Sequence, residues 1–153
     1  MFSSEEDEDT ITAMDQFCKI KISQDSDEPT QGTAGSAAYD LRSKYSILLH
    51  HGQVTKVPLK LTMALPSNMC AMIVGRSGLA AKGILAHNGI IDPDYQGECV
   101  ALLHNMTERA FPVTKGQRIA QMILLPVVPA TWTKTDKLPP TTRQGNGLGS
   151  TGS

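Results

Sequence analysis

The sequence has few cysteines, few aromatic residues and almost no net charge. Its three cysteines, Cys18, Cys70 and Cys99, are odd in number and widely spaced. This pattern argues against a disulfide framework and favours a reducing, intracellular setting, cytoplasmic or nuclear. Neither the cysteines nor the four histidines have the spacing of a structural zinc site. The formal net charge of −1 provides no broad cationic field, so we expect no direct binding of nucleic acid.

Long apolar runs are absent too, so the sequence predicts no membrane span. A chain of 153 residues and 16.5 kDa is long enough to bury a core and is typical of one domain. Residues 1–16 contain the acidic run Glu5–Asp9 and are predicted to form a disordered tail. We expect a β domain over residues 17–142 and a flexible glycine-rich segment over residues 143–153.

What the chain does contain is a series of short apolar runs separated by turn residues, which predicts an all-β sandwich or barrel. In Phe17–Ser23, apolar and charged residues alternate, as in a half-buried strand. The other predicted strands are Ser46–Leu49, Val54–Leu65, Met69–Val74, Glu98–His104, Arg118–Val128 and Thr131–Lys134, and one more begins within residues 35–41. One short helix is predicted from Arg76 to Leu85, with Ser77 as its cap.

The stretch Gly89–Glu98 combines two acids, a tyrosine and two glycines between apolar runs. Asn88 and Gly89 are typical of a tight hairpin turn, because both tolerate a positive φ. Pro93 cannot donate to a β-ladder, so Asp92 is expected at a strand end with Tyr95 three residues later. A carboxylate that activates water beside a flat aromatic surface would make a reaction site. Taken alone, this stretch favours a polar loop between two strands, with Asp94 and Glu98 solvated.

Further along the chain, two segments could bind anions. Gly75–Gly78 offers the Arg76 guanidinium, the Ser77 hydroxyl and backbone N–H groups, although an ordinary strand-to-helix turn has the same composition. The segment 143–153 contains G-x-G-x-x-G but lacks the strand and helix of a dinucleotide site. It could wrap phosphates, or be only a polar terminus.

Two polar residues lie within apolar strands. Asp40 follows Ala38-Tyr39, and both a metal-related and a structural role are open for it. Gln121 requires a hydrogen-bond partner, which either the core or a ligand could supply.

The residues of these segments, and their order along the chain, resemble the five motifs of the trimeric deoxyuridine triphosphatases (dUTPases). The matching segments are Ala38–Leu41, Arg76–Ala80, Gly89–Glu98, Arg118–Gln121 and Gly149–Gly152. The resemblance covers residues 35–153. It implies a jelly-roll-like β subunit, a homotrimer with active sites at subunit interfaces, and Mg²⁺-dependent hydrolysis of dUTP to dUMP and pyrophosphate. This reaction keeps uracil out of DNA and supplies dUMP for thymidylate synthesis.

The resemblance also assigns roles to individual residues. Asp92 would deprotonate the water that attacks the α-phosphorus, and Tyr95 would pack beneath the deoxyribose and exclude a 2′-hydroxyl. Asp40 would reach the metal through water. Uracil would be read by the backbone near residues 88–91, with Asn88, Gly89 and Ile91 as the contacts. Phosphate contacts would come from Arg76, Ser77, Gly78 and Gln121, and the closing tail would supply Arg143, Leu148, Gly149, Ser150 and Thr151.

The sequence departs from the family's pattern at Leu148, where a phenylalanine usually stacks on uracil, and at Gln144, Asn146 and Gln117. These departures concern closure of the tail and affinity, and they leave open a catalytically weak binding or signalling module. A dCTP deaminase shares the fold but needs a different acid–base set, and the Asp92–Tyr95 arrangement argues against it.

Overall fold

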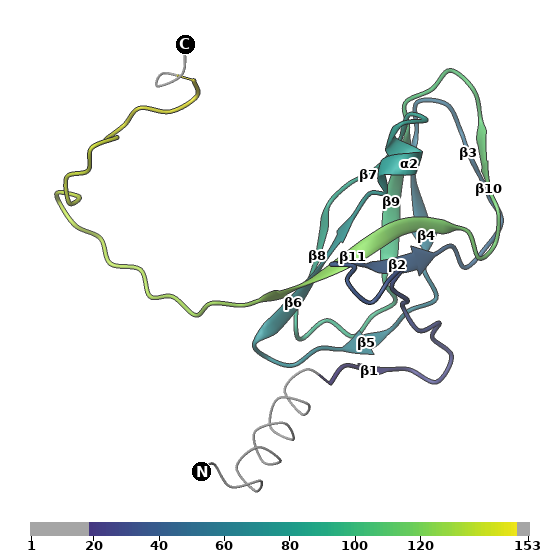
Figure 1. The fold of residues 1–153 in the computed structure, drawn as a ribbon, viewed down its shortest axis with the longest axis horizontal. Helices are drawn as coiled ribbons and strands as arrows, with labels where there is room; N and C mark the ends of the chain where they lie inside the picture. The colour runs from purple at the N-terminus through teal and green to yellow at the C-terminus, as the bar shows by residue number, and fades with distance from the viewer. Residues whose placement is uncertain (1–18, 150–153) are drawn as a thin grey trace, which may run out of the picture.

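The computed structural model describes residues 19–149 and consists of β-strands with one short helix (Figure 1). The predicted acidic tail and residues 150–153, which include Ser150 and Thr151, lie outside the described residues. The strands are β1 (Lys21–Ile22), β2 (Tyr39–Arg42), β3 (Ile47–Leu49), β4 (Val54–Pro58), β5 (Met63–Ala64), β6 (Met69–Val74), β7 (Ile84–Ala86), β8 (Gly89–Ile91), β9 (Val100–Asn105), β10 (Phe111–Val113) and β11 (Arg118–Pro126). The helix is α2 (Ser77–Ala80).

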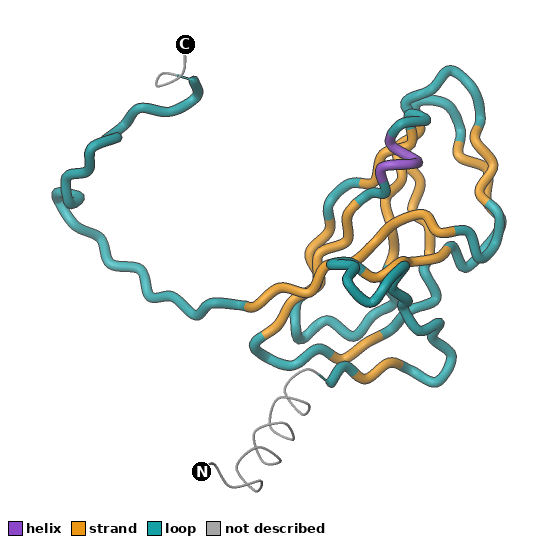
Figure 2. Tube along the Cα trace, in the orientation of Figure 1, coloured by secondary structure: helices purple, strands orange, loops and turns teal. Residues whose placement is uncertain are grey.

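Two antiparallel sheets form the body of the molecule. One sheet has the order β2-β11-β6-β8 and the other has the order β4-β9-β7. The pairs β1–β5 and β10–β3 lie at the ends of the body (Figures 1 and 2). The predicted all-β class is therefore confirmed.

Alternating side chains explain why these strands form. In β6, Ala71 and Ile73 are almost fully buried while their neighbours are only partly buried, so one face of the strand points into the core. Ala101 and Leu103 alternate in the same way on β9. Full burial of a side chain such as Ile73 contributes about 1.5–3 kcal/mol.

The predicted strand over residues 54–65 is interrupted in the structure. Lys60 has φ = 51°, in the left-handed region, and β4 ends before it. Its neighbours Leu59 and Leu61 are both buried and exchange backbone hydrogen bonds with Cys99. Alternation alone could not reveal this break, because Leu59 and Leu61 keep the period of a continuous strand.

The predicted helix over residues 76–85 was too long. Only Ser77–Ala80 is helical, and Gly83, with φ = 84°, ends the turn that follows it. Ile84 is buried in β7 instead. The prediction that Ser77 caps the helix was also wrong, since Arg76 occupies the N-cap position and no side chain caps it.

The predicted hairpin at Asn88-Gly89 does not form. The N–H of His87 donates to Leu102 O and extends the pairing of β7 with β9, whereas Gly89 pairs with Ile73 of β6. The chain thus crosses from one sheet to the other, and neither residue has a positive φ. The predicted strand at Thr131–Lys134 is wrong as well, because this segment is exposed and makes no ladder. Between residues 19 and 149, no helix is long and apolar enough to cross a membrane.

Candidate active site

The loop that carries Asp92 and Tyr95 is fixed at both ends by the core. Strand β8 ends at Ile91, and Cys99, where the loop returns, is 1% exposed. The N–H of Tyr95 donates to Asp92 O at 3.1 Å and closes a turn around Pro93. The prediction that Asp92 lies at a strand end is confirmed.

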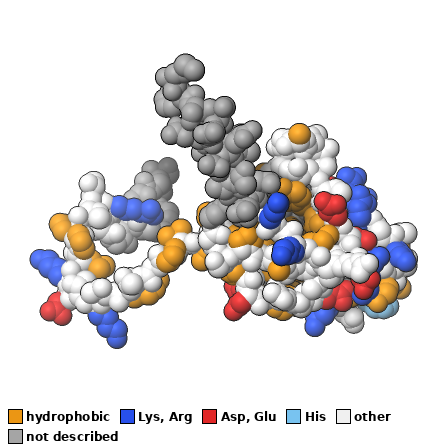
Figure 3. All heavy atoms as spheres, turned by 90° about the horizontal axis from the view of Figure 1, so that it is seen from below, with side chains coloured by type: hydrophobic (Ala, Val, Ile, Leu, Met, Phe, Trp, Pro, Cys, Tyr) orange, Lys and Arg blue, Asp and Glu red, His pale blue; other side chains and the backbone are white. Residues whose placement is uncertain are grey.

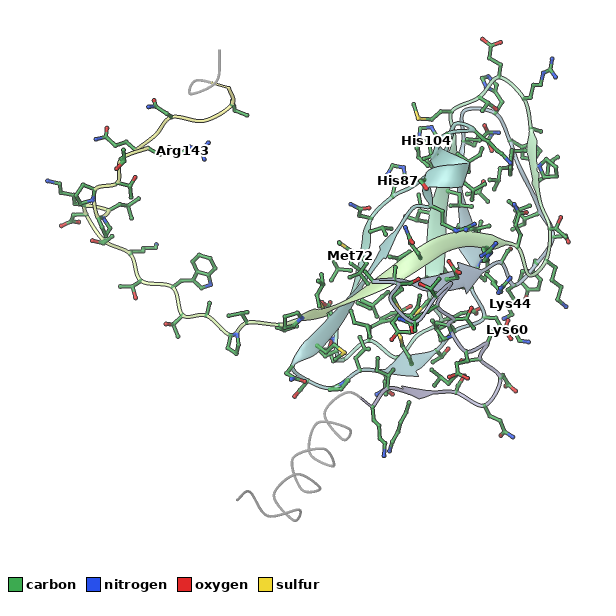
Figure 4. All side chains as sticks on the ribbon, viewed as in Figure 1. Lys44, Lys60, Met72, His87, His104 and Arg143 are labelled. Atoms are coloured by element: carbon green, nitrogen blue, oxygen red, sulfur yellow. The ribbon has the colours of Figure 1, made fainter. Side chains whose placement is uncertain are left out.

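Five of the predicted site residues line one pocket of about 210 Å³. They are Asn88, Gly89, Ile91, Asp92 and Tyr95. Ile73 and Leu102 supply apolar wall, and Glu98 and His87 supply polar rim. The His87 ring stacks on that of His104, with centroids 5.8 Å apart (Figure 4).

Strand β8 forms one wall of this pocket and is the edge strand of its sheet. In the described part of the chain it pairs only with β6. Backbone N–H and C=O groups on the opposite side of an edge strand are available to a ligand. A small hydrogen-bonding ring could therefore pair with residues 88–91 as a further strand would.

Tyr95 is held by its own loop. Its hydroxyl donates to Glu98 O at 3.0 Å, while 44% of the residue stays exposed. The ring lies against Gly97 so closely that a Cβ at Gly97 would stand 2.5 Å from Tyr95 Oη and 2.6 Å from Cζ. A flat aromatic surface is thus presented to the pocket in one orientation.

The end of this loop is tied to the body through Glu98 and Cys99. Lys44 Nζ donates to Glu98 Oε1 at 3.1 Å, and this hydrogen bond raises the pKa of Lys44. Burial raises the pKa of the Cys99 thiol to about 11, with a smaller contribution from the Glu98 charge. Cys99 is therefore an inert part of the pocket wall rather than a nucleophile.

A second group of predicted residues lies at the other end of β6. Asp40, whose side chain is 15% exposed, has Arg76 Nε at 3.8 Å and Arg118 Nη1 at 3.6 Å. Arg76 also donates to Arg118 O at 3.1 Å. The cluster carries a net positive charge and is suited to a polyanion.

Gln121 and the helix start adjoin this cluster. The Gln121 Nε2 group donates to Gly75 O at 2.9 Å, so a core partner satisfies the hydrogen bond that the sequence required. Ser77 and Gly78 are exposed at the first turn of α2, where N–H groups have no partner within the helix.

Asp92 and Arg76 are well separated within one chain. Continued past Ile91, the register of β8 sets Asp92 opposite Cys70, and Arg76 follows Cys70 by six residues of extended chain. At about 3.3 Å per residue, the Cα atoms of Asp92 and Arg76 are about 20 Å apart, although the Gly89 end of the pocket lies nearer to the cluster. They are too far apart to contact one α-phosphate and its neighbouring phosphates together.

The remaining predicted residues lie on an arm, residues 127–149, that leaves the body after β11 (Figure 1). Arg143 donates to Asn146 O within the arm, far from the pocket beside His87 (Figure 4). Leu148 is fully exposed and Gly149 has φ = 85°. In this chain the arm does not approach Asp92.

Reasoning from sequence missed Arg118 as a site residue, and it missed Lys44. Arg118 lies in the fourth motif, three residues from Gln121, so its position could have been noticed. No sequence signal links Lys44 to Glu98, because 54 residues separate them and only the fold brings them together.

The described residues include no group of three or more His, Cys, Asp or Glu able to hold a metal ion. Mg²⁺ bound to phosphates needs only one or two carboxylates and otherwise keeps its waters. Asp40, a partly buried carboxylate beside Arg76 and Arg118, fits such a role through water. Direct coordination fits less well, because two arginines already surround it.

Comparisons with known proteins agree on one family. The sequence model of the dUTPase family matches residues 24–152. The deoxyuridine 5′-triphosphate nucleotidohydrolase of Paramecium bursaria Chlorella virus 1 is 38% identical over 133 residues, covering 86% of this chain and 94% of the viral protein. The enzyme of that name from Maricaulis maris is 41% identical over 131 residues, covering 81% of this chain and 86% of its own.

Solved structures show the same fold. A mutant dUTPase of Staphylococcus bacteriophage 80alpha with dUpNHpp superposes with a TM-score of 0.82 at 17% identity, covering 89% of this chain and 99% of the phage chain. A mutant dUTPase from phage phi11 of S. aureus, described with a structural Mg(II) ion, gives a TM-score of 0.72 at 15% identity over 78% of this chain and 98% of its own.

Proposed function

Because this chain belongs to the dUTPase family and is a dUTP diphosphatase, which hydrolyses dUTP to dUMP and pyrophosphate, we propose how its residues divide that reaction. The observation that carries the proposal is the pocket that gathers Asn88, Gly89, Ile91, Asp92 and Tyr95. It offers a backbone edge, an aromatic face and a carboxylate around one cavity. These three groups suit the uracil, the deoxyribose and the α-phosphate of dUTP.

Asp92 is the general base. It accepts a proton from a water molecule, whose oxygen forms a bond to the α-phosphorus. The bond from that phosphorus to the bridging oxygen breaks, and pyrophosphate leaves. A positioned base of this kind contributes on the order of 10²–10⁴ in rate.

The pocket wall selects the nucleoside. Free backbone groups of residues 88–91 pair with the edge of uracil, while Tyr95 packs beneath the sugar. A ring held against Gly97 cannot retreat to admit a 2′-hydroxyl, so deoxyribose is preferred over ribose.

The phosphates are bound by the second cluster, contributed by another subunit. Arg76, Ser77, Gly78 and Gln121 contact the phosphate oxygens, with Arg118 and Asp40 orienting Arg76. Since about 20 Å of sheet separates Arg76 from Asp92 in one chain, a complete site needs two chains. A closed ring of three copies provides three equivalent sites at its interfaces.

The arm reaches a neighbouring subunit and closes the site. Its side chains have little to contact in their own chain: Trp132 is 94% exposed and Val128 is 79% exposed, and Figure 3 shows apolar groups on the arm away from the body. Arg143, Leu148, Gly149, Ser150 and Thr151 then cover the triphosphate and exclude water. Gln144 and Leu148 have φ near 50°, a conformation that glycine adopts more readily, so the arm is stiffer here than a glycine-richer one.

Mg²⁺ would be held by the phosphates, with Asp40 reaching it through water, and would neutralise charge that develops on them. The protein side chains have the other roles: Arg76 and Gln121 orient the phosphates, and Asp92 accepts the proton of the attacking water.

One experiment tests the assignment as a whole. The purified protein is incubated with Mg²⁺ and each common deoxynucleoside triphosphate, with dUTP and UTP included, and released pyrophosphate, released ammonia and binding of dUTP are measured. Release from dUTP alone is expected. Ammonia from dCTP would identify a deaminase instead, and binding of dUTP without turnover would identify a binding module.

A further inference from the structure

Two groups contact the Tyr95 side of the loop between β8 and β9 and fix the orientation of the ring. The first is Gly97. A Cβ there would lie 2.5 Å from Tyr95 Oη, 2.6 Å from Cζ and 3.0 Å from Cε2. All three distances are below or at the limit of real Cβ contacts, so any side chain at Gly97 must displace the ring. The left-handed conformation does not explain this glycine, since its φ is not positive.

The second group is the ion pair between Lys44 and Glu98. Tyr95 Oη donates to the backbone carbonyl of Glu98, so the position of Glu98 sets the position of the ring's outer end. The Glu98 carboxylate is in turn held by Lys44 at 3.1 Å. The N–H of Lys44 donates to Pro58 O at 2.8 Å, which connects the pair to β4 and hence to the body.

We propose that Gly97 and the Lys44–Glu98 pair are positioning groups that hold the Tyr95 ring in one orientation and thereby determine the preference for deoxyribose over ribose. The inference rests on the proposed role of Tyr95 at the sugar. Two contacts act on the ring. The absence of a side chain at Gly97 leaves room for the ring to pack against the loop, and Lys44 holds Glu98, whose backbone carbonyl accepts the hydrogen bond from Tyr95 Oη. Without either contact the ring has free solvent on its exposed side and can swing out of the pocket.

The two contacts differ in strength. The contact at Gly97 is steric, and a Cβ there would displace the outer end of the ring. The ion pair is partly exposed, with side chains 31% and 39% accessible, so it contributes little by itself. Gly97→Ala should therefore lower the dUTP/UTP ratio of kcat/KM nearly as far as Tyr95→Ala does, roughly tenfold or more. Glu98→Gln should lower it only about twofold to fivefold.

A matched control exists on the same side of the molecule. Lys60 pairs with Asp27 at 3.4 Å, with side chains 43% and 52% exposed. Lys60 lies near Lys44 (Figure 4) and lines the same shallow pocket as Lys44 and Glu98, but neither Lys60 nor Asp27 has a hydrogen bond or ion pair to Glu98 or Tyr95. Asp27→Asn removes the same charge as Glu98→Gln and should leave the dUTP/UTP ratio unchanged.

The experiment measures two properties of wild type, Tyr95→Ala, Gly97→Ala, Glu98→Gln, Asp27→Asn and the double variant Tyr95→Ala/Gly97→Ala. The first is the dUTP/UTP ratio of kcat/KM. The second is the ¹⁹F NMR signal of Tyr95 in protein labelled with 3-fluorotyrosine, assigned by its loss in Tyr95→Phe. We expect Gly97→Ala and Glu98→Gln to shift the Tyr95 signal, and Gly97→Ala to have no further effect on the ratio once Tyr95 is alanine.

An unmoved Tyr95 signal in Gly97→Ala overturns the inference. The inference is also overturned if Tyr95→Ala lowers the dUTP/UTP ratio of kcat/KM and Gly97→Ala leaves it unchanged. It is overturned as well if Gly97→Ala lowers this ratio by the same factor in wild type and in Tyr95→Ala. If Tyr95→Ala itself leaves the ratio unchanged, the proposed sugar contact is wrong, while the NMR shifts still decide whether Gly97 and Glu98 position the ring. Should Gly97→Ala fold poorly, Glu98→Gln against Asp27→Asn gives the same decision.

Discussion

The Asp92 pocket and the C-terminal arm both carry residues of the dUTPase motifs, yet they are held in opposite ways. The pocket lies between Ile91 and Cys99, both buried, and Tyr95 is fixed by a hydrogen bond and by Gly97. The arm has Trp132 and Leu148 in solvent, and its hydrogen bonds beyond residue 130 stay within it. In the proposed mechanism, chemistry and nucleoside selection belong to the folded body. Closure by the arm would depend on contacts that the described part of one chain does not contain.

The largest expected effect comes from removing the proposed general base, Asp92, on the pocket side. Asp92→Asn should lower kcat by on the order of 10²–10⁴ while dUTP binding is kept, because the amide cannot accept the proton of the attacking water. Steady-state kinetics and calorimetric titration with a non-hydrolysable dUTP analogue measure the two quantities. Near-normal kcat would remove Asp92 from the mechanism.

Deleting residues 143–153 tests the other side of the comparison. We expect kcat/KM to fall by on the order of 10², since closure positions the triphosphate and excludes water. The body should stay folded and keep its oligomeric state, because the deletion removes no strand. Circular dichroism and light scattering check this. Full activity in the truncated protein would show that residues 143–153 are only a polar terminus with no role in closing the site.

Burial of Cys99, at the end of the pocket loop, should affect how protein stability depends on pH. Burial raises the pKa of Cys99 from 9.0 to about 11, so the unfolded chain releases this proton before the folded one does. The stabilisation is complete below pH 9 and is lost as pH rises to about 11, which amounts to about 2–3 kcal/mol. Urea unfolding at pH 8 and pH 11 should show a steeper loss in wild type than in Cys99→Ala. An equal loss of unfolding free energy between pH 8 and pH 11 in both proteins would mean that Cys99 is exposed to solvent.

The smallest effect concerns the arm's apolar contact. Leu148→Phe should tighten dUTP binding by about 0.5–1.5 kcal/mol, because a ring can stack on uracil where leucine cannot. The KM for dUTP should be lower in Leu148→Phe than in wild type, and the two proteins should have equal KM for a substrate that lacks the base. An unchanged KM would show that residue 148 does not reach uracil.

The sequence predicted the pocket better than the rest of the site, and the reason is local. The position of Asp92 at the end of β8 follows from Pro93 and nearby residues, so short-range rules suffice for it. The grouping of Asp92 with Tyr95 in a site rested instead on the resemblance to the dUTPase motifs, because the local pattern alone favoured a solvated loop. The partnership of Lys44 with Glu98 and of Asp40 with Arg118 depends on strand order, which no local pattern contains.

Errors in the fold have the same origin. Residues 84–86 have good helical neighbours, yet tertiary pairing with β9 makes them a strand. Asn88-Gly89 has the composition of a hairpin turn, but its two flanking strands belong to different sheets. Thr131–Lys134 has strand composition and finds no partner strand in the described part of its own chain.

The most direct test of the account asks whether one chain can build a site alone. Asp92→Asn and Arg76→Ala are each expected to be nearly inactive, and the two are co-expressed with different tags and purified as mixed oligomers. If Asp92 and Arg76 of one site come from different subunits, about a quarter of the sites in randomly mixed trimers combine two intact residues, and activity recovers toward that fraction of wild type. Mixing Asp92→Asn with Asp92→Ala is the control and should recover nothing. Mixed oligomers of Asp92→Asn and Arg76→Ala that show only the sum of the two residual activities would contradict a site shared between subunits.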